Sequence, residues 1–131
     1  LNPDEFNREI TDSQWKAQVY RCMRRIPTLE EPSRKRGVVD LYDVSDDWLP
    51  IYDSTRIKGY YMAIGSSGNQ FKNAPIAGHC MAELIEACEK GQNHDEDPVQ
   101  VKTVYTGLTL NMGFYSRNRE INPNSSFSVN G

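Results

Sequence analysis

Residues 59–85 read GYYMAIGSSGNQFKNAPIAGHCMAELI, and this stretch decides the fold. The apolar run over 59–64 predicts a strand, and because the run is nearly continuous we expect both faces of that strand to be covered. The small residues over 65–68 predict a turn. Pro75 suits the first turn of a helix, and the apolar residues spaced three and four apart beyond it predict an amphipathic helix that ends near Gly91.

The sequence before this unit predicts a helix and further strands. Partial helical spacing of apolar residues indicates a helix over 3–26, which divides in two if a cap at Thr11-Asp12-Ser13 starts a second helix near Ser13. The β-rich stretch GVVDLYDV predicts a strand over 37–44. A short strand follows in WLPIYD, where Pro50 argues for an edge position or an interrupted ladder.

The sequence after this unit predicts strands and a tail. Alternating β-branched residues over 99–114 indicate one long strand, or a hairpin broken near Gly107. The segment 121–131 is turn-rich, and we expect it to be partly loose. The predicted class is therefore α+β, with a few mixed or antiparallel strands and two or three helices in a single structural unit over 1–131.

Composition excludes several classes of function. The chain has 131 residues, a net charge of −3, a pI near 5.4 and a mean hydropathy of −0.69. This balance gives no electrostatic case for nucleic acid or for an acidic membrane surface, and no apolar run is long enough to span a membrane. Three cysteines at spacings unlike a metal site predict free thiols, no bound metal and a reducing, cytoplasmic location.

The joint between strand and helix, GSSGNQFK over 65–72, is the most informative segment. Its two glycines and its lysine lack the spacing of a nucleotide P-loop, and the chain contains no GxGxxG dinucleotide fingerprint. Free backbone N–H groups, the helix dipole and Lys72 together would attract an anion. The alternative is a plain connection in which Gly68 supplies a positive φ and Lys72 is solvated.

An ordered set of motifs resembles the C-terminal part of FAD-dependent amine and amino-acid oxidoreductases, the group of the sarcosine oxidases, dimethylglycine dehydrogenase-like enzymes, glycine oxidase and D-amino-acid oxidase. The motifs are DVSDDWLPIYD, KGYYMAIG, SSGNQFK, NAPIAG and HCMAELI, and the match spans about 36–88. The resemblance implies that the chain is a C-terminal fragment of an FAD-binding fold plus substrate domain. Its flavin-proximal region would be 36–90, followed by the strand or hairpin and tail over 91–131.

The same resemblance implies the function and its residues. The parent enzyme would oxidise the C–N bond of an amine or N-methyl amino acid by hydride transfer to flavin. Lys72 would hold the substrate carboxylate, and Trp48 would lie near the substrate or the flavin. The expected flavin contacts are Gly65, Ser66, Ser67, Gly68, Asn69, Gln70 and Phe71. The pyrophosphate-binding Rossmann half would lie upstream of Leu1, so we expect the chain alone to be inactive.

Two departures from the family qualify this prediction. The chain has Asn69-Gln70 where the family often has His-Gly, which would change the substrate or the flavin contacts. Asp40 stands at the position where some members attach FAD through a cysteine, so the resemblance implies non-covalent FAD.

A second hypothesis is a small, self-contained α+β binding or interaction module without catalysis, in which the joint is only a turn. An orphaned flavin fragment would expose apolar surface and self-associate. Outside the joint, we expect His94 to be solvent-exposed in its acidic loop, and Arg117 and Arg119 to form an ordinary surface ion-pair face.

Overall fold

The computed structural model describes residues 2–125, which form two compact units. The first ends at Leu41 and the second begins at Tyr42. The sequence predicts one unit over 1–131, whereas the contacts within the chain fall into these two groups.

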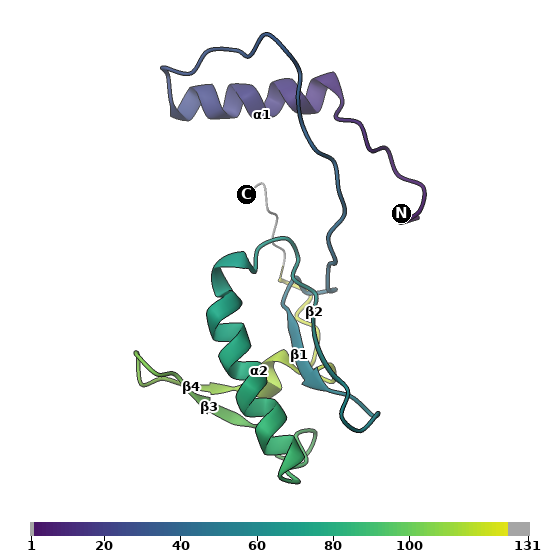
Figure 1. The fold of residues 1–131 in the computed structure, drawn as a ribbon, viewed down its shortest axis with the longest axis vertical. Coiled ribbons are helices and arrows are strands. Elements are labelled where there is room, and N and C mark those ends of the chain that lie inside the picture. Colours follow the sequence, from purple (N-terminus) through teal and green to yellow (C-terminus); the bar gives the residue numbers. More distant parts are fainter. Residues whose placement is uncertain (1, 126–131) are drawn as a thin grey trace. The chain divides into compact units, whose positions relative to one another are not determined.

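The first unit is built on one helix, α1 (Asp12–Arg25) (Figure 1). Thr11 caps it: the Gln14 N–H donates to Thr11 Oγ1 at 3.3 Å, and the Gln14 side chain reaches back to the Thr11 N–H. The prediction of a helix from residue 3 is wrong, and the alternative start near Ser13 is close to the observed one. Asn2 and Asn7 each accept a backbone N–H two residues on, and such local bonds compete with helix formation.

In the second unit, residues 42–125 form two small antiparallel sheets and one long helix (Figure 1). Strands β1 (Ile51–Ser54) and β2 (Tyr61–Ile64) pair with Ile51 opposite Ile64. Strands β3 (Gln100–Lys102) and β4 (Thr109–Asn111) form the hairpin predicted around Gly107. The α+β class and the antiparallel strands are thus confirmed.

Helix α2 (Ala74–Glu89) connects the two sheets, and its N-terminus follows a short 3₁₀ helix, η1 (Phe71–Asn73). It contacts both β1 and β3. The core consists of side chains from α2, both sheets and the second 3₁₀ helix, η2 (Met112–Tyr115); its buried members are Tyr52, Cys80, Leu84, Val99, Val101 and Met112. The predicted helix after Pro75 is confirmed, and Gly91 just past its end has the expected positive φ, +99°.

Two strand predictions are wrong. Residues 37–44 form no regular structure: Val38, Leu41, Tyr42 and Val44 are all exposed, and no strand within residues 2–125 pairs with them, so their β propensity is not realised. Strand β2 is not covered on both faces, because Ala63 and Ile64 are exposed in a sheet of only two strands.

Candidate functional site

The joint between β2 and α2 is a turn with several unusual backbone conformations. Gly65 and Gly68 have positive φ values of +68° and +72°, and Ser67 between them has +49°. At Gly65 and Gly68 a side chain would be costly in this backbone conformation, so glycine suits both positions. Ser67 is buried and its hydroxyl donates to the Gly65 carbonyl at 3.2 Å, which stabilises the turn from within.

The first donors of the joint are bound by the chain's own carboxylate. Asp43 Oδ2 accepts the N–H groups of Gly65 and Ser66, the latter at 3.1 Å, and Asp43 Oδ1 accepts the Ser66 hydroxyl at 2.6 Å. The Ser67 N–H donates to the Asp43 carbonyl at 2.9 Å. The Ser66 hydroxyl bond, with help from the backbone N–H bonds, lowers the pKa of Asp43.

Most of the later backbone donors of the joint have no partner among the described residues, the exception being the Asn69 N–H, which donates to the Ser66 carbonyl at 3.1 Å. The backbone N–H groups of Gly68, Gln70, Phe71 and Lys72 have no acceptor among the residues that the structure describes. Phe71 is 97% exposed and Lys72 is also exposed. These four donors and the lysine immediately precede α2, where the helix dipole also favours negative charge.

The Gln70 side chain lines a cavity of about 270 Å³. Its Oε1 accepts the Asn73 side-chain amide at 2.9 Å, and its own amide donates to Asn69 at 2.6 Å. The cavity is otherwise lined mainly by apolar side chains: Leu49, Pro50, Tyr52, Ile76, Ala77, Cys80, Leu110 and Tyr115. Of the predicted contact residues, Gln70 therefore lines a mostly apolar cavity, whereas Phe71 and Lys72 are exposed to solvent.

Trp48 lies in a turn that is fixed by its neighbour. Asp47 is 1% exposed and accepts two bonds from the Arg119 guanidinium, from Nε at 2.8 Å and from Nη2 at 2.6 Å. The hydrogen bonds from Arg119 lower the pKa of Asp47 to about 2, although burial of the carboxylate opposes this shift. Trp48 itself is half-buried at φ +61°, a region that bulky residues seldom occupy.

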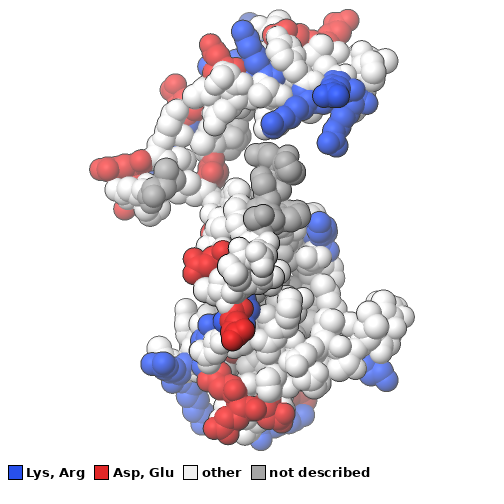
Figure 2. Space-filling model, turned by 180° about the vertical axis from the view of Figure 1, so that it is seen from behind, with Lys and Arg blue, Asp and Glu red and all other residues white. Residues whose placement is uncertain are grey.

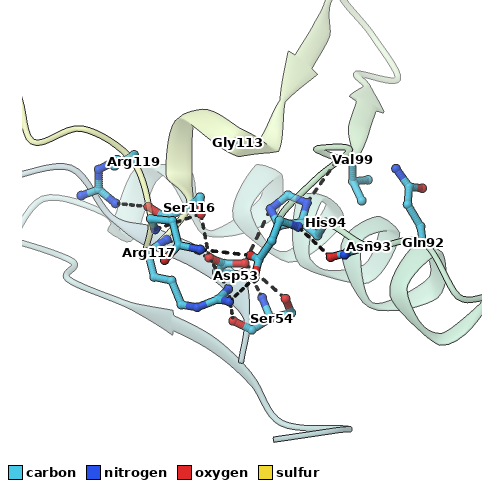
Figure 3. A network of polar contacts seen from close by, with 12 residues as sticks. Asp53, Ser54, Gln92, Asn93, His94, Val99, Gly113, Ser116, Arg117 and Arg119 are labelled. Atoms are coloured by element: carbon cyan, nitrogen blue, oxygen red, sulfur yellow. Dashed lines mark hydrogen bonds and ion pairs between the residues drawn. The ribbon is translucent and has the colours of Figure 1, made fainter. Parts of the chain in front are cut away.

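A second buried carboxylate, Asp53 on β1, organises the network drawn in Figure 3. Its Oδ2 accepts the Ser116 hydroxyl at 3.0 Å, the Arg117 backbone N–H at 2.7 Å and the Arg117 guanidinium at 2.9 Å. Arg117 also pairs with Asp95 at 2.5 Å. The prediction that Arg117 and Arg119 form a surface ion-pair face is therefore wrong, because each arginine pairs with a buried carboxylate.

His94 completes this network and is not solvent-exposed as predicted, because only 3% of it is accessible. Its Nδ1 accepts the Val99 N–H at 3.1 Å, so Nε2 carries the proton of the neutral ring. Nε2 faces Asp53 Oδ1 at 3.6 Å, too far for a hydrogen bond, and has no other partner among the described residues.

Serine, histidine and aspartate lie together here, but not as a nucleophilic triad. The Ser116 hydroxyl donates to Asp53 rather than to His94, whereas a nucleophilic serine needs the imidazole as its base. All three side chains are buried. The network thus fastens three distant segments of the second unit together.

The sequence alone does not reveal the partners of Asp43, Asp47 and Asp53. The available signal was the spacing of aspartates in DVSDDWLPIYD beside the alternating arginines of RNR over 117–119. Which acid would meet which donor depends on tertiary structure, since their separations range from 22 to 72 residues.

The comparisons with known proteins identify no relative: no family model, curated protein or solved structure matches the chain. Within residues 2–125, no cluster of three or more histidine, cysteine or acidic side chains could hold a metal ion. No helix in the same part of the chain is long and apolar enough to cross a bilayer.

Proposed function

We propose that the chain is a C-terminal part of an FAD-dependent oxidoreductase that oxidises the C–N bond of an amine or N-methyl amino acid. The motif order over about 36–88 is the basis of this proposal. The observation that supports it is the set of four N–H donors, at Gly68 and over 70–72, that have no acceptor within residues 2–125 and lie beside the exposed Lys72. An electron-rich edge of a ring or a carboxylate would fit such a set of donors.

The joint fits flavin in part. Gly65 and Ser66 cannot donate to a flavin oxygen while their N–H groups bind Asp43, so the fit depends on Gly68 and on 70–72. The exposed Phe71 side chain would add apolar contact area for a flat ring. When bound, FAD would supply the hydride acceptor.

The residues of this chain would bind and orient the substrate and the flavin. Lys72 would pair with the substrate carboxylate as a flexible point charge, and its exposure leaves it free to do so. The free N–H donors would stabilise negative charge, because they are fixed before any ligand arrives. Asp40 offers no thiol for a covalent bond, so FAD would be held non-covalently. Trp48 is anchored through Asp47 and would shape the pocket rather than react.

Riboflavin tests the contact without needing the missing pyrophosphate site. In ¹⁵N-labelled full chain, we expect riboflavin to shift the amides of Gly68 and of 70–72 saturably, and the amides of Gly65 and Ser66 much less. Lys72→Gln should leave these shifts in place but abolish those caused by an added N-methyl amino acid. Lys58→Gln, at another exposed lysine, is the control. Shifts spread evenly over exposed apolar residues, or none at all, would count against a flavin site.

A genomic observation tests the fragment itself. If the reading frame upstream of Leu1 encodes a strand followed by GxGxxG, the dinucleotide-binding sequence that the flavoenzyme proposal requires is present, and the proposal is supported. Turnover of sarcosine or dimethylglycine by the chain alone would contradict the expectation that it is inactive.

The alternative is the self-contained binding module, and the internally bonded carboxylates favour it. Asp43, Asp47 and Asp53 all find donors within the second unit, as in a complete domain. Ultracentrifugation and calorimetry separate the two: a monomer with one cooperative transition for residues 42–131 supports the module, and concentration-dependent association supports the fragment.

A further inference from the structure

The Asp43 carboxylate is bound in the manner of a ligand. Three donors converge on its two oxygens: the N–H groups of Gly65 and Ser66 on Oδ2, and the Ser66 hydroxyl on Oδ1. Consecutive N–H groups in a turn with a positive φ form a concave anion-binding nest. The occupant comes from 22 residues earlier in the chain and is no part of the turn itself.

The segment that delivers this carboxylate is weakly held. Residues 42–44 form no helix or strand, and Tyr42 and Val44 are each 49% exposed. Beyond the carboxylate, the hydrogen bond from the Ser67 N–H to the Asp43 carbonyl ties the segment to the turn. Asp43 is itself exposed, so water can replace its bonds when it leaves, and local opening of so lightly packed a segment is inexpensive.

We propose that the turn at residues 65–67 is a carboxylate-binding site that the chain keeps filled with its own Asp43, and that a small external carboxylate binds there when Asp43 is released. The ligand is planar, because the donors address two oxygens of one carboxylate group. Asp43 thus acts as an internal competitor that closes the site. This inference rests on the Asp43 contacts alone and does not depend on the flavoenzyme proposal.

Chemical rescue tests the proposal in the full chain, with acetate as the probe and chloride holding the ionic strength constant. In Asp43→Ala, we expect the amide signals of Gly65 and Ser66 to move from their wild-type positions. Added acetate should return them toward those positions along a saturable curve. Wild type should show no such curve, because its own carboxylate is tethered in place.

Asp46→Ala is the matched control, because Asp46 is an exposed aspartate in the same connector and its loss changes the net charge equally. It should behave as wild type. Asp43→Asn adds a neutral side chain of the same shape, and we expect acetate to shift its Gly65 and Ser66 amides less than in Asp43→Ala. If acetate moves these amides no further than chloride does, or if Asp43→Ala is unfolded with and without acetate, Asp43 is only a structural tie and the proposal is overturned.

Discussion

Replacing Asp47 by asparagine tests whether the buried ion pair with Arg119 stabilises the second unit. The carboxylate is 1% exposed and accepts two guanidinium bonds, the Leu49 N–H at 3.2 Å and the Ser45 hydroxyl at 3.3 Å. Asparagine has nearly the same shape but no charge. Asp47→Asn therefore removes the ionic part of the contact and leaves Arg119 without its counter-charge.

The size of the effect follows from the pKa of Asp47. Folding lowers this pKa from 3.8 to about 2, mainly through the Arg119 hydrogen bonds. At 1.36 kcal/mol per unit, the shift corresponds to about 2 kcal/mol of folding free energy. Because the folded pKa is the lower one, this stability is fully present above 3.8 and is lost as the pH falls through about 2. Stranding the partly buried Arg119 adds to the cost, so we expect a loss of about 2 to 4 kcal/mol near neutral pH.

Urea unfolding followed by Trp48 fluorescence measures this difference, in a Trp15→Phe background that leaves Trp48 as the sole tryptophan. The gap between wild type and Asp47→Asn should narrow by about 2 kcal/mol from neutral pH to about pH 2. Asp46→Asn, at the exposed neighbour, should cost less than about 0.5 kcal/mol. A cost for Asp47→Asn that stays constant over this pH range would refute the ionic explanation.

Three further substitutions probe the core, the Asp53 network and α1. Leu84→Ala should cost about 2 to 5 kcal/mol in urea unfolding, because Leu84 is fully buried on α2. Arg117→Ala should cost about 3 to 5 kcal/mol at neutral pH, since it strands the buried Asp53, and a cost under about 1 kcal/mol would show that Ser116 and the backbone suffice. Thr11→Ala should lower the helical circular dichroism of α1 by removing a cap worth about 1 kcal/mol, without changing the urea midpoint of the second unit.

The local sequence pattern was sufficient to predict an element where residues within or next to that element determine its ends. Helix α2 begins near Pro75, whose restricted φ suits the first turn of a helix. It ends before Gly91, which readily adopts the positive φ found there. The hairpin around Gly107 likewise followed from alternation and one glycine. Residues 37–44 show where local pattern is insufficient: their composition predicts a strand, but among the described residues no strand pairs with them.

The site was less predictable, because its chemistry depends on contacts between distant segments. The sequence singled out the joint and Lys72 as candidates for binding an anion, which stays a prediction, and it could not show that Asp43 binds two of the N–H donors there. His94 illustrates the same difficulty. Its acidic neighbours predict a solvated loop, whereas in the structure it is buried against Asp53.

Three internally bound aspartates limit which donors of the second unit remain open to a ligand, and Asp43 does so at the joint itself. Asp43, Asp47 and Asp53 each neutralise donors that would otherwise attract an external anion, including both Arg117 and Arg119. Lys72 remains exposed beside N–H groups that have no acceptor among the described residues, while the earlier half of the turn is closed by Asp43. In the wild-type chain a small anion would therefore meet Lys72 and these later N–H groups, and it would reach Gly65 and Ser66 only by displacing Asp43. Asp43→Ala should accordingly add acetate-dependent amide shifts at Gly65 and Ser66 without changing those at Lys72.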